Sequence, residues 1–236
     1  CRAGAGGRSL LVTMARNALE DVEYGDATFC KVRIGAHVVS QALVVATGVS
    51  IDGTREVLGT AVGDSESYEF WREFLVSLKA RGLSGVHLVI SDAHAGLKAA
   101  VAQQFSGSSW QRCRVHFMRN LHTAVAAKHA PAVTAAVKTI FAHTDADEVA
   151  AQWDRVADTL ATSFPKVAAM MTEAKSDVLA FTAFPKAHWQ KIWSNNPIER
   201  LNKEIKRRAD VVEIFPNPAA FLRLATAVVI ESHDEW

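Results

Sequence analysis

The segment Val86 to Ile90 constrains the fold of this chain more than any other short stretch, because it is an apolar run interrupted only by His87. Such a run is typical of a strand that is buried on both faces of a sheet. Helices must then cover both faces, and the segment 93–104 that follows is predicted to be one of them. With 236 residues and 49% hydrophobic content, the chain is long enough to bury the core that this arrangement needs.

Four further strands are predicted around this run. Three precede it, at residues 28–33, 38–49 and 56–62, and one follows it, at residues 110–113. Gly35 and the pair Asp52-Gly53 are turn signals, so the first three strands are expected to be consecutive and antiparallel. The resulting order, with helices between the later strands, predicts an α/β fold with a mixed five-stranded sheet flanked by helices.

Helical periodicity appears in two further regions. The first helix is predicted to be capped by Asp64 or Ser65 and stopped by Gly82, and its apolar face is formed by Trp71, Phe74, Leu75 and Leu78. The second region, 117–180, is rich in alanine and carries no strand pattern, with breaks at Pro131 and Phe164-Pro165. We therefore expect an all-helical insertion. The predicted division is an atypical segment 1–24, a first core part 25–116, a helical insertion 117–190 and a core completion 191–236.

Composition excludes several classes of protein. Three cysteines do not make a disulfide framework for a chain of this size, which favours a reducing compartment. The longest apolar run, Ala42 to Ile51, is far shorter than the roughly 20 residues of a membrane span, and no signal peptide is expected. The formal net charge is only +1, but basic residues gather at 111–130 and 186–208. These segments indicate either a surface that faces a polyanion or simply solvated helix faces.

The segment Asn196 to Arg208 joins a carboxylate to a basic stripe. Asn196 is a good N-cap and Pro197 suits the first helical position, so a helix is predicted to begin here with Glu199 at its third position. At 3.6 residues per turn, Glu199 shares a face with Asn202, Lys203 and Lys206. Glu199 either completes a capping box with Asn196 or takes part in chemistry on a phosphate backbone.

Two aspartates upstream favour the chemical reading of Glu199. Asp26 stands at the head of the first predicted strand, and Asp92 comes directly after the buried run. If those strands are neighbours, both carboxylates project into one crevice. Hard divalent cations such as Mg²⁺ take oxygen ligands of this kind. The alternatives are that Asp92 or Ser91 caps the helix that follows and that Asp26 is an ordinary strand-entry residue.

Four blocks of the sequence together resemble a known family, the Mutator-type transposases of bacterial insertion sequences. These belong to the DDE recombinases, which have a ribonuclease H-like fold. The blocks are 25–33 (GDATFCKVR), 89–94 (VISDAH), 111–116 (QRCRVH) and 196–208 (NPIERLNKEIKRR). The resemblance covers about Gly25 to Trp236. It implies that Asp26, Asp92 and Glu199 are a catalytic triad that binds two Mg²⁺ or Mn²⁺ ions, and that the helical region is the family's insertion before the glutamate.

The resemblance also implies partners and supporting residues. Double-stranded DNA, both element ends and target, is the expected partner, with a homo-oligomer on the DNA, no membrane, and a cytoplasmic, nucleoid-associated location. The expected DNA-binding residues are Arg112, Arg114, Trp189, Trp193, Arg200, Lys203, Lys206, Arg207 and Arg208. Residues expected to support the active site are Cys113, His116, Asn196 and Asn202.

Two of these assignments have alternatives. Cys113 and His116, with His122 nearby, could seed a zinc site, but four ligands at recognisable spacing are not found. Trp189 and Trp193 either belong to the core or stack on unpaired bases at the element's end.

The chain departs from the family pattern at its start. Family members have an apolar strand that leads into the first aspartate, whereas Glu20 to Tyr24 is acidic here and Cys1 to Leu19 matches nothing recognisable. The family's N-terminal DNA-binding helices are also missing, so a truncated or rearranged product is expected. The leading interpretation is a metal-dependent transposase. A catalytically inactive DNA-binding remnant is the alternative, and the long insertion disfavours a ribonuclease H-type host enzyme.

Overall fold

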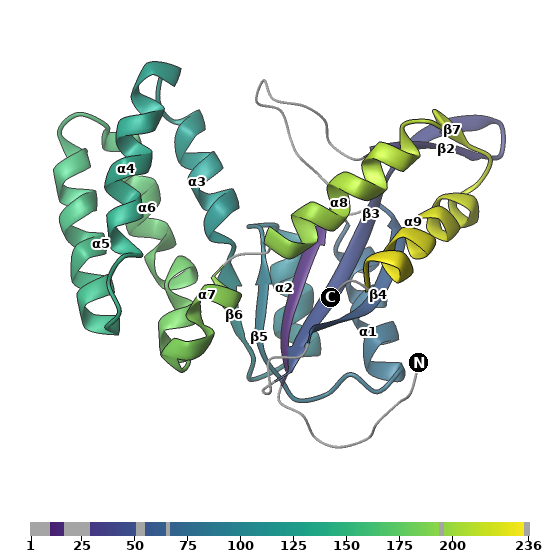
Figure 1. Cartoon of the computed structure of the whole chain (residues 1–236), viewed down its shortest axis with the longest axis horizontal. Helices are drawn as coiled ribbons and strands as arrows, with labels where there is room; N and C mark the ends of the chain where they lie inside the picture. The colour runs from purple at the N-terminus through teal and green to yellow at the C-terminus, as the bar shows by residue number, and fades with distance from the viewer. Residues whose placement is uncertain (1–9, 17–28, 51–54, 65–66, 194–195, 234–236) are drawn as a thin grey trace. The chain divides into compact units, whose positions relative to one another are not determined.

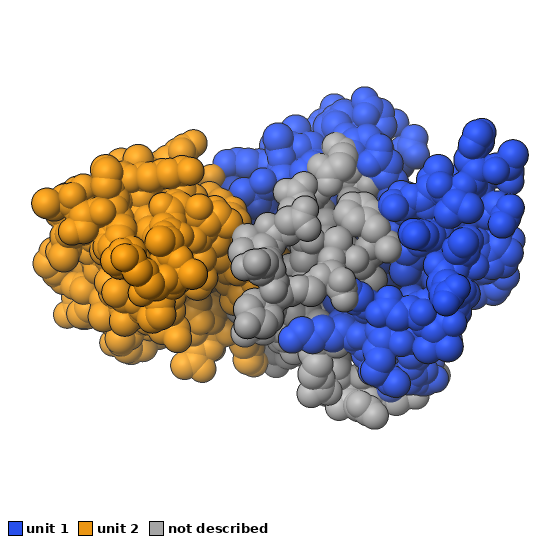
Figure 2. Space-filling view, turned by 90° about the horizontal axis from the view of Figure 1, so that it is seen from above, with its two compact units in different colours: residues 1–110, 195–236 blue, residues 111–194 orange. Residues whose placement is uncertain are grey.

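The computed structural model describes residues 10–16, 29–50, 55–64, 67–193 and 196–233. The chain divides into two compact units, which Figure 2 colours separately. One, the sheet unit, comprises residues 1–110 and 195–236, and the other, the helical unit, comprises residues 111–194.

The sheet unit is built on one mixed sheet, which has seven strands in the described part of the chain. These are β1 (Leu10–Arg16), β2 (Phe29–Ile34), β3 (His37–Ser50), β4 (Arg55–Gly63), β5 (Val86–Ser91), β6 (Ser109–Arg112) and β7 (Ile214–Phe215). Strands lie at the five predicted places, but the predicted number of five was wrong. β1 and the two-residue β7 were missed because each is defined by pairing with distant strands rather than by a local pattern.

Strand β3 is paired along both of its edges. Ala42 pairs with Phe29 of β2 and also with Gly63 of β4, so β2 and β4 lie on opposite edges of β3. β1 and β4 both pair with the segment 44–49 of β3, so they too lie on opposite edges. β1 and β2 therefore lie end to end along one edge, both antiparallel to β3. β1 also pairs in parallel with β5.

Alternate residues of β3 face two different layers of helices. Leu43 and Val45 pack in one cluster with Leu201 and Ile205 of α8 (Asn196–Ala209) and with α9 (Pro218–His233). Val44 and Ala46 pack in another cluster with Trp71 of α1 (Tyr68–Ala80) and with α2 (Ala95–Gln104). Figure 1 shows these helix pairs on opposite sides of the sheet. We call the first side the α8 face and the second the α1 face.

The cap of α1 differs from the prediction. The N-cap is Ser67, whose Oγ accepts a hydrogen bond from the backbone N–H of Phe70 at 3.0 Å. Asp64 precedes this position by three residues, and Ser65 lies outside the described residues. Gly82 follows the helix with a φ of 101°, in the left-handed region that glycine tolerates.

The helical unit contains α3 (Arg114–Thr123), α4 (Ala130–Ile140), α5 (Ala146–Ala161), α6 (Pro165–Val178) and α7 (Trp189–Ile192). Pro131 and Pro165 stand at the starts of α4 and α6, where a missing N–H costs nothing. The core centres on Trp153, which is fully buried and stacks on Phe117 with 5.5 Å between ring centroids. Its Nε1 donates to the Met171 carbonyl at 3.1 Å. No helix in the described part of the chain is long and apolar enough to cross a membrane.

Hydrogen bonds join the two ends of the helical unit. The fully buried Gln111 donates from Nε2 to the Val178 carbonyl at 2.6 Å, and its Oε1 accepts from the Phe181 amide at 2.8 Å. The amide of Arg114 donates to the carbonyl of Trp193 at 3.0 Å. These contacts explain why the unit runs from 111 to 194, beyond the segment 117–190 that the sequence indicated.

Candidate active site

Asp92 lies directly after β5, half-buried, with its Oδ1 atom buried. The sequence left open whether Asp92 or Ser91 simply caps the next helix. In the structure the N-cap of α2 is His94, whose Nδ1 accepts from the Leu97 amide at 3.2 Å. The capping explanation was therefore wrong for both residues. It failed because the helix begins two residues later than the predicted 93, at Ala95.

The direction of Asp92 follows from its neighbours in β5. Val89 belongs to the cluster on the α1 face. Ser91 also belongs there, since its Oγ accepts from Nε1 of Trp110 at 2.9 Å and Trp110 packs against the same cluster. Successive side chains of a strand point to opposite faces. Asp92 follows the last residue of β5, and if the alternation continued for one more residue, position 92 would face the α8 side.

Helix α8 packs on that same face through residues four apart. Leu201, Ile205 and Ala209 are at most 3% exposed and form the buried stripe of the helix. The backbone of Glu199 belongs to α8, two residues before Leu201, but its side chain lies outside the described residues, as do those of Asn196 and Arg200. Asp26 lies outside the described residues altogether. The convergence of the three predicted carboxylates therefore stays a prediction.

Asn202 stands three residues after Glu199 in α8. Its Oδ1 is buried and has no hydrogen-bond partner within the described part of the chain. Buried polar atoms are normally paired, and exceptions often lie at functional sites. Asn202 was predicted as a supporting residue, and this observation agrees with a polar environment beside the start of α8.

Four basic residues of α8 follow Leu201. Lys203 is exposed and Lys206 is half-buried. Arg207 pairs with Glu204 at 2.7 Å, and Arg208 pairs both with Glu204 at 2.9 Å and with Glu231 of α9 at 2.6 Å.

These ion pairs also change the pKa of Glu204. The hydrogen bond from Arg207, followed by that from Arg208, lowers the pKa of Glu204 to about 2. Sequence reasoning missed these partners. The four-residue spacing of Glu204 and Arg208 is a signal for their ion pair. No local pattern indicates the pair of Arg208 with Glu231.

Aromatic and basic side chains of the helical unit pack on one another. The guanidinium of Arg114 lies 4.1 Å from the ring centroid of Trp193 and 4.6 Å from that of Phe141. Burial lowers the pKa of Arg114. The guanidinium of Arg112 stacks over Phe117 at 5.1 Å.

The second predicted stacking residue, Trp189, is 6% exposed and donates from Nε1 to the Phe184 carbonyl at 2.8 Å. Its ring meets Phe181 edge to face at 5.2 Å. Trp189 therefore belongs to the core of the helical unit, and Trp193 lies against Phe181 and Arg114.

Cys113 is fully buried at the N-cap position of α3, and the Nδ1 atom of His116 is buried one turn later. The described residues contain no group of three or more His, Cys, Asp or Glu side chains that could hold a metal ion. Of the residues predicted to bind metal, only Asp92 has a described side chain.

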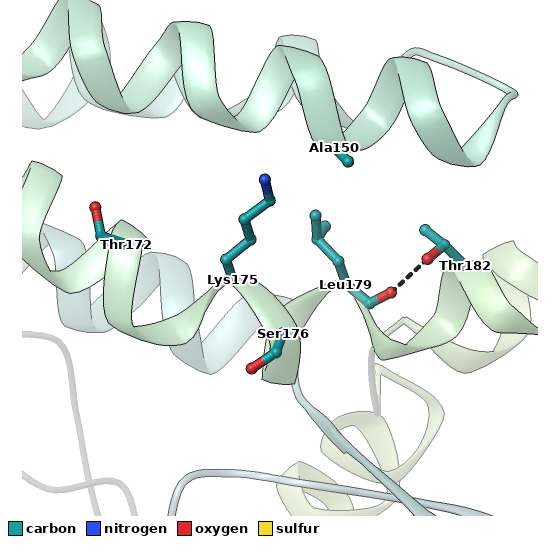
Figure 3. A pocket seen from close by; sticks show the side chains of 6 residues that line it. All are labelled: Ala150, Thr172, Lys175, Ser176, Leu179 and Thr182. Carbon is teal, nitrogen blue, oxygen red and sulfur yellow. Dashed lines mark hydrogen bonds between the residues drawn. The ribbon is translucent and has the colours of Figure 1, made fainter.

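A shallow hollow of about 430 Å³ lies between α5 and α6 of the helical unit (Figure 3). Its only charged lining residue, Lys175, pairs with Asp154 at 2.7 Å. None of the predicted site residues lines it, so we do not assign it to the site. The lining residues are Ala150, Thr172, Lys175, Ser176, Leu179 and Thr182.

Comparison with known proteins adds independent information. The family described as "Transposase, Mutator family" matches residues 18–236. The transposase for insertion sequence element IS1081 from Mycobacterium tuberculosis is 49% identical over 211 residues, which is 89% of this chain and 51% of the relative. The transposase for element ISRM5 from Rhizobium meliloti is 39% identical, covering 89% and 53%. The transposase for element IS256 in transposon Tn4001 from Staphylococcus aureus is 38% identical, covering 89% and 54%.

This chain spans about half the length of the curated relatives that it matches. The match nevertheless extends over nearly all of its own sequence, from the residues before Asp26 to the C-terminal helix. The predicted family is confirmed: the chain belongs to the Mutator family of transposases.

Proposed function

We propose that this chain carries the catalytic core of an insertion-sequence transposase, which cleaves DNA at the element's ends and joins it to a target. Asp26, Asp92 and Glu199 are the proposed metal-binding carboxylates. One observation carries the proposal. Val89 and Ser91 of β5 face the α1 side of the sheet, and the next residue along the alternation, Asp92, would face the side on which α8, the helix of Glu199, is packed.

The arrangement of strands supports a ribonuclease H-like core. β1 and β2 occupy one strand position along β3, so the main sheet positions run β4, β3, β1 with β2, β5 and β6. The first three positions are antiparallel and β5 is parallel to β1. This mixed arrangement is compatible with the ribonuclease H-like fold that the family resemblance implies, and the small β7 pairs beside β2.

The donor set suits Mg²⁺ or Mn²⁺, because three carboxylates supply hard oxygen ligands. Two bound ions would provide an activated water and stabilise the leaving oxygen of the phosphodiester. Asp92 would hold such an ion from a rigid position, since it directly follows a buried strand and its Oδ1 is shielded from solvent. Asn202 would support the site from α8 through its buried oxygen.

DNA contact is assigned to Lys203, Lys206, Arg207 and Arg208 of α8. Lys203 is exposed, whereas Glu204 and Glu231 offset part of the charge of Arg207 and Arg208. In the helical unit, Arg112 and Arg114 stack on aromatic rings and Trp189 is buried, so their contact with DNA would require repacking. Arg200 and Trp193 stay in the proposed set, as do a homo-oligomer on DNA and a cytoplasmic, nucleoid-associated location.

A cleavage assay tests the proposal. The full chain is incubated with a duplex that carries an element end, with Mg²⁺ or Mn²⁺ or with neither. Asp92→Asn and Glu199→Gln should each lower cleavage by about a thousandfold or more, with DNA affinity within about twofold of the parent chain. Asp154→Asn, at the ion pair with Lys175, is the matched control and should cut normally. A parent chain that binds the duplex without cutting it in any metal would identify an inactive remnant.

A further inference from the structure

The sheet continues as a narrow ribbon beyond the end of β4. Gly63, the last residue of β4, pairs with Ala42, so residues 37–41 of β3 extend past it. These residues pair with β2, and β7 pairs with the other edge of β2. We call residues 37–41, β2 and β7 the ribbon, and Figure 1 shows β2 and β7 together at one end of the sheet.

One face of the ribbon is covered by helices. Cys30, Val32 and Phe215 point to the α8 face and are buried in the cluster that includes α8 and α9. On the other side of the sheet, the cluster with α1 and α2 reaches β3 at Val44 and Ala46. Within the described part of the chain, that cluster includes no residue of the ribbon. The α1 side of the ribbon is therefore not covered by these helices.

The uncovered side carries five side chains, which we call the open face. Lys31 pairs with both Ser40 and Ile214, and Arg33 pairs with Val38. Residues that pair directly share a face, and alternation along β2 sets this face opposite to Cys30 and Val32. Val38 is 44% exposed and Ile214 is 42% exposed, and the other three side chains are exposed as well. Large apolar side chains gathered at a surface mark sites of interaction.

The open face is positively charged. Residues 29–41 contain no Asp or Glu, and neither do the two residues of β7. Within the described residues Lys31 and Arg33 form no ion pair, whereas Arg207 of α8 does, and Glu213, which precedes β7, pairs with neither of them. Lys31 and Arg33 are two residues apart along a strand, which is about 6.6 Å. The two cations can therefore contact successive phosphates of one DNA strand, and Ser40 can donate to the same backbone.

The charge of this face favours DNA over a second copy of the chain. In an isologous contact the same patch of both copies meets, so Lys31 and Arg33 would approach the same two cations of the other copy. Like charges that face each other are destabilising. A polyanion is instead attracted by these charges.

We propose that the open face binds the phosphate backbone of the target duplex. The inference rests on the proposed function, which requires the element's end and the target to be held at the same time. α8 packs on the opposite side of the sheet, and a duplex is stiff over the length of one domain, so DNA that lies on α8 is a separate duplex from DNA on the open face. Contacts to phosphates hold DNA independently of its sequence, which suits a target rather than an element end that has to be recognised.

The test measures the binding of two labelled duplexes to the full chain by fluorescence anisotropy. The first duplex carries an element end and is saturating, and the second has an unrelated sequence. Each parent chain should bind one of each. The double change of Lys31 and Arg33 to alanine should weaken binding of the second duplex about tenfold or more. It should also flatten the slope of log affinity against log salt for that duplex by about 1.8, since each phosphate contact contributes about 0.9. The affinity for the first duplex should change by less than about twofold.

Two control variants separate the charge of the open face from charge elsewhere and from folding. Lys31→Arg combined with Arg33→Lys keeps both charges and should bind the second duplex within about threefold of the parent chain. Lys128 and Lys166 are exposed cations of the helical unit, and their double change to alanine should leave the affinity for the second duplex unaltered. All four side chains are exposed, so circular dichroism should show the parent fold in every variant.

Several outcomes would overturn the inference. One is an equal loss of both duplexes in the Lys31 and Arg33 variant, and another is a parent chain that binds one duplex only. If that variant instead loses a dimer in light scattering and keeps both affinities, the open face is a contact between copies. If the parent chain cuts the element end but the variant holds the second duplex as tightly as the parent, this inference fails and the proposed function stands. If the second duplex binds as expected but no metal supports cleavage, the proposed function fails and the DNA surface stands.

Discussion

The two units of the chain differ in how their buried side-chain amides are paired. In the helical unit, Gln111 is fully buried and uses both ends of its amide, and Nε1 of Trp153 reaches the Met171 carbonyl. In the sheet unit, within the described residues, the side-chain oxygens of Gln41 and Asn202 are buried without a hydrogen-bond partner. Buried polar groups without hydrogen-bond partners tend to lie at functional or strained sites. The unpaired amide oxygen of Asn202 agrees with the site proposed in the sheet unit, whereas the paired amide of Gln111 stabilises the helical unit.

The largest expected effect tests whether each unit can lose stability without loosening the other. Trp153 of the helical unit and Trp71 of the sheet unit are both fully buried, so they form a matched pair. Each change to alanine should cost about 3–5 kcal/mol of unfolding free energy, because it removes a large ring and leaves a cavity. Hydrogen exchange should show that Trp153→Ala loosens α5 and α6, and Trp71→Ala loosens β5 and α2. Equal loosening of both units by either variant would contradict the comparison.

A smaller effect is expected at the join of the helical unit. Gln111→Ala leaves the Phe181 amide and the Val178 carbonyl without their partner, which should cost about 1–3 kcal/mol. Chemical denaturation measures the loss. The exposed Gln190 is the control, and its change to alanine should stay within about 0.5 kcal/mol. Equal costs at both positions would mean that the satisfied amide adds nothing to the stability of the unit.

DNA-binding measurements should distinguish Lys203 and Lys206 of α8 from Arg207. The double change of Lys203 and Lys206 to alanine should flatten the slope of log affinity against log salt by about 1.8, since each phosphate contact contributes about 0.9. The loss should be similar for unrelated sequences. Arg207→Ala should change the slope by less than about 0.5, because Glu204 already offsets that charge. A larger change of slope for Arg207→Ala than for the double lysine variant would show that Glu204 does not offset the charge of Arg207.

The smallest expected effect depends on pH. The pKa of Glu204 is about 2 in the folded chain, below its ordinary value of 4.5, because Arg207 and Arg208 donate hydrogen bonds to it. Its stabilising contribution is therefore complete above about pH 4.5 and is lost as the pH falls toward 2. Glu204→Gln should be less stable than the parent chain at pH 7, and the difference should shrink across that window. A difference that is independent of pH would exclude the ion pairs as its cause.

Prediction from the sequence succeeded where the pattern was local. The strand predicted at residues 38–49 lies within β3, the apolar run lies within β5, and α8 begins at the predicted Asn196. Failures occurred where a partner was distant. β1 pairs with residues 44–50, and Arg208 reaches Glu231 from another helix.

The caps show a different reason for failure. Asp64 and Ser65 are as good as Ser67 by residue type, and Asp92 is a better cap than His94 by preference alone. The choice depends on where the chain enters the helix, and tertiary packing decides that. The convergence of Asp26, Asp92 and Glu199 likewise depends on tertiary packing rather than on local pattern, and it stays a prediction.

The join of the helical unit has a consequence for chain architecture. Arg114 and Trp193 are 79 residues apart in the sequence (193 − 114), yet one hydrogen bond of 3.0 Å links their backbones. A folded segment whose ends meet is topologically equivalent to a short loop in the protein that hosts it, so it closes that loop at little extra entropic cost. The insertion point between β6 and α8 can thus accept segments of very different length. Replacing residues 115–192 by a few glycines and serines tests directly whether the sheet unit folds without the helical unit.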